Sequence, residues 1–369
     1  MKREFLCIDV IRAGTNYCVD DISLSGYKFI LGDKPYYYKN LILENGTTIT
    51  IGYYYKYQYL FVKCSLPKVV HGNNRKLMTI GDIDKVSSVI NQVLLAGGIT
   101  ARFEDFVVSN VEVSFNYICS SPNDKAVYVD LFNKKSVGRR KNCEYGTSAV
   151  IKNKSCRTTV YDKEAEELYR NQNLTLTDKE KRYIRVEHKV PKRVLWKYKY
   201  HCTVKDLFNM NLKEVLREEN RKVGLDMKIL NKKEFYKVLH EKIQHKDEAV
   251  KHRIITFYEE LNEYGENYVK GKYSRYVFNS YRNIMLEDGI NTVHTNSNIK
   301  NVIDFQKVDQ NTFIQFTKQE IKRIISKIKG GNNEDKNEKS YFEKMVFFKP
   351  FCLLCKLLFG PSGKFVDTS

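Results

Sequence analysis

Residues 157–167 read RTTVYDKEAEE and join a strand-forming stretch to one suited to the first turns of a helix. Thr158, Val160 and Tyr161 favour a β-strand, and the acidic residues after Val160 suit a helix N-terminus. Such a junction would hold the phenol of Tyr161 at the edge of a sheet, with Lys163 nearby. A tyrosine placed there can attack a phosphodiester and form a covalent intermediate. Most of the 26 tyrosines, however, are expected to serve packing or the surface.

Strand-like sequence continues on both sides of this junction. At 106–117, FVVSNVEVSFNY alternates apolar and polar residues, which places Glu112 on the polar face of a predicted strand. At 182–190, RYIRVEHKV alternates in the same way and places Glu187 on a polar face. Two predicted strands therefore each carry one carboxylate on a polar face. Either the two belong to one site or both faces are simply solvated.

Turn signals organise the N-terminal part of the chain. Asn45-Gly46 lies between β-rich runs and is the strongest short hairpin signal in the sequence. Pro67 should end a strand and lead into a loop, KVVHGNNRKL at 68–77. In that loop His71 and Asn73 are candidates for contact with a phosphate through a Gly/Asn turn, and an ordinary turn is the alternative. Further strands are expected at 2–11, 26–31 and 57–64.

Helical patterns complete the predicted α+β fold. Apolar residues at helical spacing predict a helix at 82–96, and strand signals stop beyond residue 206. Helices are expected at 212–223, 233–243, 248–264 and 274–287. We therefore expect a mainly antiparallel sheet with flanking helices, followed by a helical C-terminal region. The expected parts are residues 1–210, 211–295 and 296–369.

The second of these parts contains a pattern compatible with helix-turn-helix DNA binding. A glycine-containing turn precedes a helix expected to begin at Lys272, so that Lys272 and Arg275 would contact DNA. An accessory helical bundle is the alternative. Residues 296–369 carry a predicted basic helix at 318–329, a polar linker and an apolar tail.

Net charge narrows the class of partner. Lys and Arg number 63 against 44 Asp and Glu, a net charge of +19 that favours a polyanion, with nucleic acid as the first candidate. An anionic membrane surface is the rival, but the apolar tail is too short and interrupted to span a bilayer. A membrane partner is therefore not expected.

Cysteine usage and the N-terminus indicate a reducing compartment. The nine cysteines are scattered except for Cys352 and Cys355, and that pair lacks the second ligand pair of a zinc site. The first residues are too polar for a secretory signal. Free thiols in a cytoplasm are therefore expected, here that of a bacterial host cell on the resemblance described next.

Five blocks in order resemble one protein family. SLPKVVHGNN, VSNVEVSFN, RTTVYDKEAEEL, YIRVEHKVPKRVL and VKHRIITFYEELNEYGENYVKGKYSRYVFNSYRNIMLEDGI are similar to the gene-two-type rolling-circle replication initiators of filamentous bacteriophages and related plasmids. The similarity covers roughly residues 1–295, and its specificity comes from order and spacing. It implies a nicking-domain-like fold and a site-specific DNA nickase and strand transferase. Such an enzyme nicks a double-stranded origin, frees a 3′-OH for a host polymerase, works with a host helicase and later rejoins the displaced single strand.

The resemblance also implies roles for individual residues. Tyr161 matches the tyrosine that takes the 5′-phosphate, and Lys163 keeps its place two residues on. Glu187 matches a family acidic residue, Glu112 stands where the family has an aspartate, and Glu166 matches an acidic position without an assigned role.

These residue types suit phosphoryl transfer. Carboxylates from two strands can hold a hard divalent ion, Mg²⁺ or Mn²⁺, against a phosphate oxygen. A phenol has a pKa near 10, so Lys163 or Arg157 would stabilise the developing charge. No paired His-x-His occurs among the seven histidines, which favours carboxylate ligands, and His188 should face away from Glu187. No Walker motif is present, in agreement with an initiator that uses a host helicase. No small-molecule cofactor is expected. A non-catalytic origin- or nucleic-acid-binding regulator is the alternative function.

Overall fold

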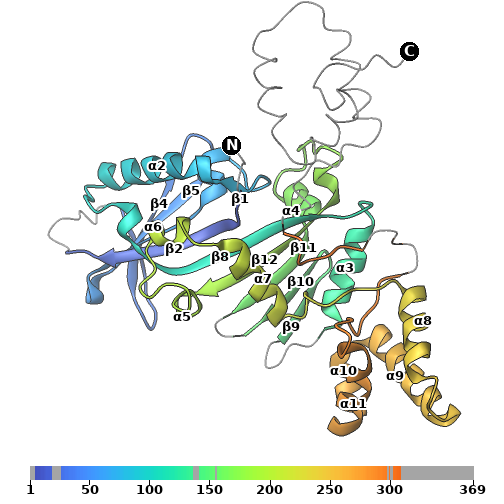
Figure 1. The fold of residues 1–369 in the computed structure, drawn as a ribbon. Helices are drawn as coiled ribbons and strands as arrows, with labels where there is room; N and C mark the ends of the chain where they lie inside the picture. Colours follow the sequence, from blue (N-terminus) through green and yellow to red (C-terminus); the bar gives the residue numbers. More distant parts are fainter. Residues whose placement is uncertain are drawn as a thin grey trace, which may run out of the picture. The chain divides into compact units, whose positions relative to one another are not determined.

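The computed structural model describes residues 5–18, 26–135, 141–153, 156–296, 299 and 302–308 (Figure 1). Contacts group Glu4–Thr312 into one compact unit. The predicted basic helix at 318–329, the linker and the tail with Cys352 and Cys355 lie outside the described residues. The proposed boundary near residue 210 stays a prediction.

A ten-stranded antiparallel sheet forms the centre of this unit. The four strands at each end of the sheet follow one another in sequence as a meander. The two strands between these meanders pair with each other and join them. The strand order is β3 (Lys28–Ile30), β4 (Tyr36–Ile42), β5 (Thr48–Tyr54), β6 (Tyr59–Ser65), β2 (Ile8–Asn16), β8 (Val107–Ile118), β12 (Tyr183–Pro191), β11 (Arg157–Asp162), β10 (Ser148–Lys152) and β9 (Lys141–Tyr145). A separate two-stranded pair joins β1 (Phe5–Leu6) and β7 (Met78–Thr79). The predicted antiparallel α+β fold is confirmed.

The predicted hairpin at Asn45-Gly46 is also confirmed. It joins β4 and β5, and Gly46 has a φ of +78°, which favours glycine because other residues rarely adopt it. The Leu43 N–H donates to the Thr47 carbonyl at 2.8 Å, which closes the turn.

One face of the sheet carries the main core. On β8, Val111, Val113 and Phe115 are fully buried, as the alternation predicts. Helices α3 (Asp124–Asn133) and α7 (Leu212–Lys222) contact this half of the sheet. Helix α2 (Ile83–Ala96) adds its buried apolar residues to the same core cluster. The opposite face of β8, β12 and β11 is left for polar side chains.

Buried polar residues tie α7 and the end of the described chain to this core. Asn220 of α7 contacts His188 Nε2 through its Oδ1 at 2.7 Å, and its Nδ2 donates to the Phe305 carbonyl at 2.9 Å. The Tyr117 hydroxyl donates to the same carbonyl at 2.9 Å. The ring of Phe305 packs at 4.7 Å from Tyr117 and at 5.8 Å from Tyr128. The segment 302–308 is therefore part of the sheet's core.

The helical region follows the sheet in sequence, as expected. Two short helices lead into it, α5 (Lys192–Leu195) and α6 (Val204–Phe208). After α7 come α8 (Lys232–Ile243), α9 (Glu248–Tyr264), α10 (Glu266–Lys272) and α11 (Arg275–Leu286), drawn in yellow to orange in Figure 1. Phe257 of α9 is fully buried among aromatic rings of α11 and Tyr273. In the described part of the chain, every helix is too short or too polar to cross a membrane.

Two local predictions are wrong. Pro67 does not lead into a loop, because Leu66–His71 forms helix α1. Proline is well tolerated in the first turn of a helix, where its missing N–H has no partner to lose. The helix expected at 274–287 is confirmed as α11 (Arg275–Leu286), but Lys272, which the helix-turn-helix interpretation placed at its start, is the last residue of α10. Glycine at 271 did not prevent the preceding segment from being helical.

We expect Asn220→Ala to lower the free energy of unfolding by about 1–3 kcal/mol, because it removes buried hydrogen bonds to His188 and to the Phe305 carbonyl. Urea denaturation would measure the change. The control is Asn209→Ala, an exposed asparagine that donates to the Lys205 carbonyl. Equal stability of the two variants would contradict the prediction.

Candidate functional site

The polar face of three adjacent strands brings the predicted residues together. In the register of β11 and β12, Tyr161 lies opposite Arg185, and Thr159 lies opposite Glu187. In the register of β12 and β8, Glu112 lies opposite Lys189. Because side chains alternate along each strand, these residues share one face. Tyr161, Glu187 and Glu112 therefore lie on one face of the sheet, an arrangement in which the two carboxylates can belong to one site.

The Tyr161 hydroxyl donates a hydrogen bond of 2.7 Å to Glu187 Oε1. Tyr161 is 8% exposed. Its burial raises the pKa of the phenol well above its usual value, the nearby Arg185 guanidinium acts to lower that pKa, and the Glu187 charge raises it further. The phenol therefore stays protonated near neutral pH unless a neighbouring base accepts its proton.

A small hollow lies beside this pair. It has a volume of about 120 Å³ and is lined by Glu112, Arg157, Thr159, Glu187 and Lys189. Two of these residues are anionic and two are cationic, and Arg157 and Lys189 are exposed. Arg157 and Lys189 can contact the oxygens of a phosphate group in this hollow, whereas the two acids would repel it unless they are protonated or a cation lies between.

Both carboxyl groups of the hollow have raised pKa values. Burial raises the pKa of Glu187 to about 7, with Asp9 and Glu112 adding to the effect and Arg185 opposing it. Burial and Asp9 also raise the pKa of Glu112, and Arg157 and Lys189 lower it. A carboxylate with a pKa near 7 is suited to accept a proton at neutral pH.

Arg185 is the buried cation that contacts several groups of the site. It is completely buried, and it contacts Glu187 Oε1 through Nε at 2.9 Å. Its NH2 group donates to Asp9 Oδ2 at 2.7 Å and to the Ser114 hydroxyl at 2.8 Å. Its NH1 group donates to the Asn74 carbonyl. One guanidinium therefore fixes groups from four separate segments of the chain.

Asp9 reaches Arg185 because β2 carries a bulge. Ile8 pairs with Val113 and Ile11 with Val111, so that Asp9 and Val10 both lie opposite Glu112. Burial acts to raise the pKa of Asp9, but Arg185 and hydrogen bonds from Ser65 and Asn74 hold it below its usual value. Asp9 is therefore a charged partner of Arg185.

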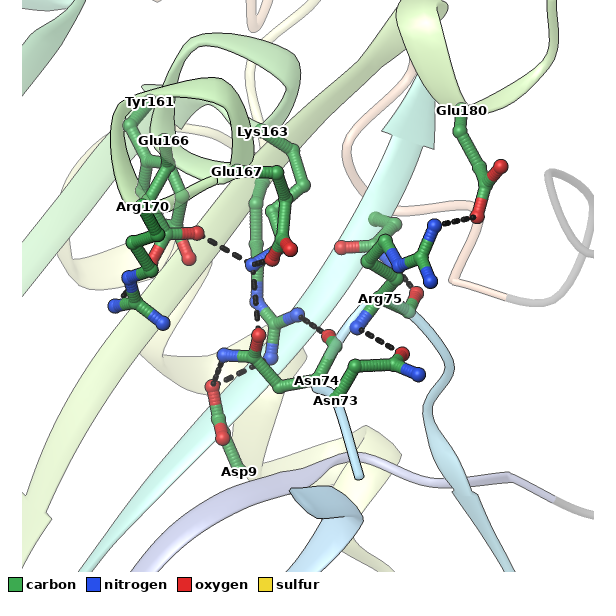
Figure 2. A network of polar contacts seen from close by, with 12 residues as sticks. Asp9, Asn73, Asn74, Arg75, Tyr161, Lys163, Glu166, Glu167, Arg170 and Glu180 are labelled. Carbon is green, nitrogen blue, oxygen red and sulfur yellow. Dashed lines mark hydrogen bonds and ion pairs between the residues drawn. The ribbon is translucent and has the colours of Figure 1, made fainter. Parts of the chain in front are cut away.

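Lys163 lies at the start of helix α4 (Lys163–Arg170), directly after the predicted strand-to-helix junction (Figure 2). Its Nζ contacts Glu166, lies 2.7 Å from Glu167 Oε1 and donates to Asn74 Oδ1 at 3.0 Å. The ammonium lies 5.8 Å from the centre of the Tyr161 ring. Lys163 thus lies beside the tyrosine, but its ammonium forms ion pairs with two carboxylates of its own helix.

The residues singled out in the sequence HGNN lie differently from the prediction. His71 ends α1, and its Nε2 lies 3.5 Å from Asp82 Oδ2. Asn73 folds back on its own turn, donating to the His71 carbonyl and accepting from the Arg75 N–H. The next residue, Asn74, is the one that joins the site, since its side chain links Lys163 to Asp9.

Four further candidates have clear positions. His188 faces the core, as expected, with Nδ1 at 2.9 Å from the Thr158 hydroxyl and Nε2 on Asn220, so both nitrogens are engaged. Arg157 lines the hollow and donates to Thr159. Lys272 contacts Glu260, and Arg275 is an exposed residue at the start of α11. The structure does not join Lys272 or Arg275 to the hollow.

A metal ion would have two ligands from the chain. Among the described residues, no group of three or more His, Cys, Asp or Glu is placed to hold a metal ion. Glu112 and Glu187 face the same hollow, and Mg²⁺ often binds through one or two carboxylates, with water and substrate phosphate completing its shell. The pair fits an ion that is shared with a bound phosphate.

Sequence reasoning missed Asp9, Asn74 and Arg185. Arg185 has a signal that was available, because it shares the polar face of its strand with Glu187. Asp9 depends on a bulge, and Asn74 depends on a loop that crosses from α1, so neither follows from strand alternation.

No protein-family model matches the chain, and no curated protein matches it. The resemblance to rolling-circle initiators therefore stays a prediction.

We expect Glu187→Gln to change how stability depends on pH. The raised pKa means that the folded state binds more protons than the unfolded state between the usual value of 4.5 and about 7, so wild-type stability falls as pH rises through this window. Relative to wild type, the variant should gain about 2–3 kcal/mol between pH 4.5 and pH 8.

Urea denaturation in EDTA at several pH values would measure this gain. Glu248→Gln, at a side chain that is 90% exposed, serves as the control. A stability difference that does not vary with pH would show that Glu187 titrates normally.

Proposed function

We propose that this protein is a site-specific DNA nickase and strand transferase of the rolling-circle initiator type, with Tyr161 as its nucleophile. The observation that carries the proposal is the 2.7 Å hydrogen bond from the Tyr161 hydroxyl to Glu187, beside a hollow lined by two acids and two cations. The net charge of +19 favours a nucleic-acid substrate.

The proposed step exchanges one phosphodiester bond of the DNA for a bond between phosphorus and Tyr161. The Tyr161 oxygen attacks the phosphorus, its proton passes to Glu187, and the bond from phosphorus to the 3′-oxygen breaks. The 3′-oxygen leaves as a hydroxyl after it takes up a proton, and the 5′-phosphate remains on the tyrosine. The reverse reaction rejoins a strand without ATP, because the bond energy is kept in the phosphotyrosine.

The neighbouring residues would orient this step. Arg185 keeps Glu187 in reach of the phenol, while Arg157 and Lys189 offer positive charge to the phosphate oxygens in the hollow. A divalent ion held by Glu112 and Glu187 would neutralise further phosphate charge. Lys163 is better suited to position α4 and Asn74 than to meet the phosphate, because it already contacts two carboxylates.

A non-catalytic DNA-binding protein is the second candidate. The observation that favours it is the burial of Tyr161, which is 8% exposed and has a raised pKa. A buried tyrosine bonded to a carboxylate is also a common packing arrangement. The two candidates differ in whether the Tyr161 oxygen becomes linked to DNA.

We expect wild-type protein to convert supercoiled DNA of its own replicon to open circles with Mg²⁺ or Mn²⁺, and Tyr161→Phe to lose this activity. Tyr169→Phe is the matched control, because Tyr169 lies on α4 and is 90% exposed. Peptide mapping should find the DNA-linked residue at Tyr161. Binding without nicking by wild-type protein would favour the second candidate, and an adduct on another tyrosine would replace the nucleophile.

We expect Glu187→Gln to abolish metal-dependent nicking and to leave DNA binding intact, since the acceptor of the phenolic proton is lost. Nicking assays and gel shifts on the same preparations would check both, with Glu248→Gln as control. Retained cleavage in Glu187→Gln would remove Glu187 from the reaction.

A further inference from the structure

Six aromatic residues cluster on the first half of the sheet, on strands β4, β5 and β6 and the short 3-10 turn η2 (Tyr55–Tyr57). We call this set the tyrosine face, and its members are Tyr36, Tyr38, Tyr54, Tyr57, Tyr59 and Phe61. The Tyr36 ring lies 5.1 Å from Tyr54 and 5.7 Å from Phe61, and Tyr54 lies 6.4 Å from both Tyr57 and Tyr59. The rings therefore form one continuous aromatic cluster, in which Phe61 is buried, Tyr57 is exposed and the other four residues are partly exposed.

The tyrosine face is separate from the main core. Ile49, Ile51 and Tyr53 alternate to the other side of β5 and belong to the core cluster, whereas none of the six rings does. Phe61 covers Gly52, where an added Cβ would meet its ring at 2.2 Å. The tyrosine face thus lies on the side of the sheet that faces away from the core. Tyr57 is 53% exposed.

Positive charge borders this surface. The Arg12 guanidinium lies 3.9 Å from the centre of the Phe61 ring and donates to the Tyr54 hydroxyl at 2.8 Å. Lys63, opposite Arg12, and Lys28, opposite Tyr38, are exposed. Strands β4, β5 and β6 contain no Asp or Glu. The aromatic rings can stack on the bases of a nucleic acid, and the bordering cations can attract its phosphates.

The tyrosine face continues toward the hollow. Arg12 lies opposite Asn110 of β8, two residues before Glu112 on the same side of that strand. Lys63 is close enough to Glu112 to act on its pKa. Four strand spacings of about 4.8 Å separate β4 from β8, roughly 19 Å.

We propose that the tyrosine face binds single-stranded DNA by stacking its bases on the rings, with Arg12 and Lys63 contacting the phosphates on the way to the hollow. Unpaired bases are required, because the faces of paired bases are already covered by their neighbours in a duplex. The choice of DNA over RNA rests on the proposed function, but the stacking itself does not require nicking. The binding of DNA can therefore fail or succeed independently of the reaction.

The test measures binding of full-length Tyr161→Phe protein to fluorescein-labelled dT20 by anisotropy, in EDTA so that no cleavage contributes. Tyr57→Leu in this background should weaken binding about tenfold or more, whereas Tyr57→Phe should bind like its parent because the ring remains. Tyr264→Leu is the matched control, since Tyr264 is 55% exposed, pairs with the Tyr268 ring at 4.7 Å and lies on α9.

Second measurements separate stacking from general charge attraction. Tyr36→Leu should also weaken dT20 binding. Arg12→Gln should make dT20 binding less sensitive to salt. Either change should reduce the affinity for a 20-base-pair duplex less than the affinity for dT20. Unchanged dT20 affinity in both leucine variants, an equal loss on the duplex, or tighter binding of U20 than of dT20 would each overturn the proposal. A wild-type protein that binds dT20 through these rings but never nicks would refute the proposed function alone.

Discussion

The buried guanidinium of Arg185 is the interaction on which the rest of the site depends. It lies between Asp9 and Glu187, two carboxyl groups from strands that are not adjacent in the sheet, and it also bonds Ser114 and the Asn74 backbone. Burying a charge is costly unless it is paired and hydrogen-bonded. The several acceptors around this one cation meet that requirement, and they fix the spacing between the phenol of Tyr161 and its acceptor.

This arrangement divides the acidic groups into two kinds. Asp9, with a lowered pKa, balances Arg185, whereas Glu187, with a raised pKa, shares the same cation but also faces Glu112 and the hollow. Two carboxyl groups that differ in this way are a common arrangement where one must stay charged and the other must exchange a proton. The bulge in β2 produces the difference, because it brings a third acid to a face that regular alternation would give only two.

Strand alternation was sufficient to predict which face of the sheet carries the carboxylates, but not which buried residues support them. The sequence placed Glu112 and Glu187 on polar faces and His188 on the opposite one, because period-two patterns determine these directions. The same patterns predicted the antiparallel sheet and most of the later helices. They could not predict that Asn74 rather than Asn73 enters the site, because a helix at Leu66–His71 replaces the expected loop and changes the path of the following residues. Helical spacing alone could have paired Lys163 with Glu166 and Glu167, three and four residues later. The burial of this ammonium beside Asn74 depends instead on how α4 packs.

The return of Phe305 to the core has a consequence for the order in which the molecule is made. The bond between the Tyr117 hydroxyl and the Phe305 carbonyl joins residues 188 positions apart. At a synthesis rate of about 5–20 residues per second, roughly 10–40 s pass between the two on the ribosome. Throughout that interval the nascent sheet lacks the ring that packs against Tyr117 and Tyr128. A newly made chain therefore carries β11, with Tyr161, before the core to which Phe305 contributes is closed.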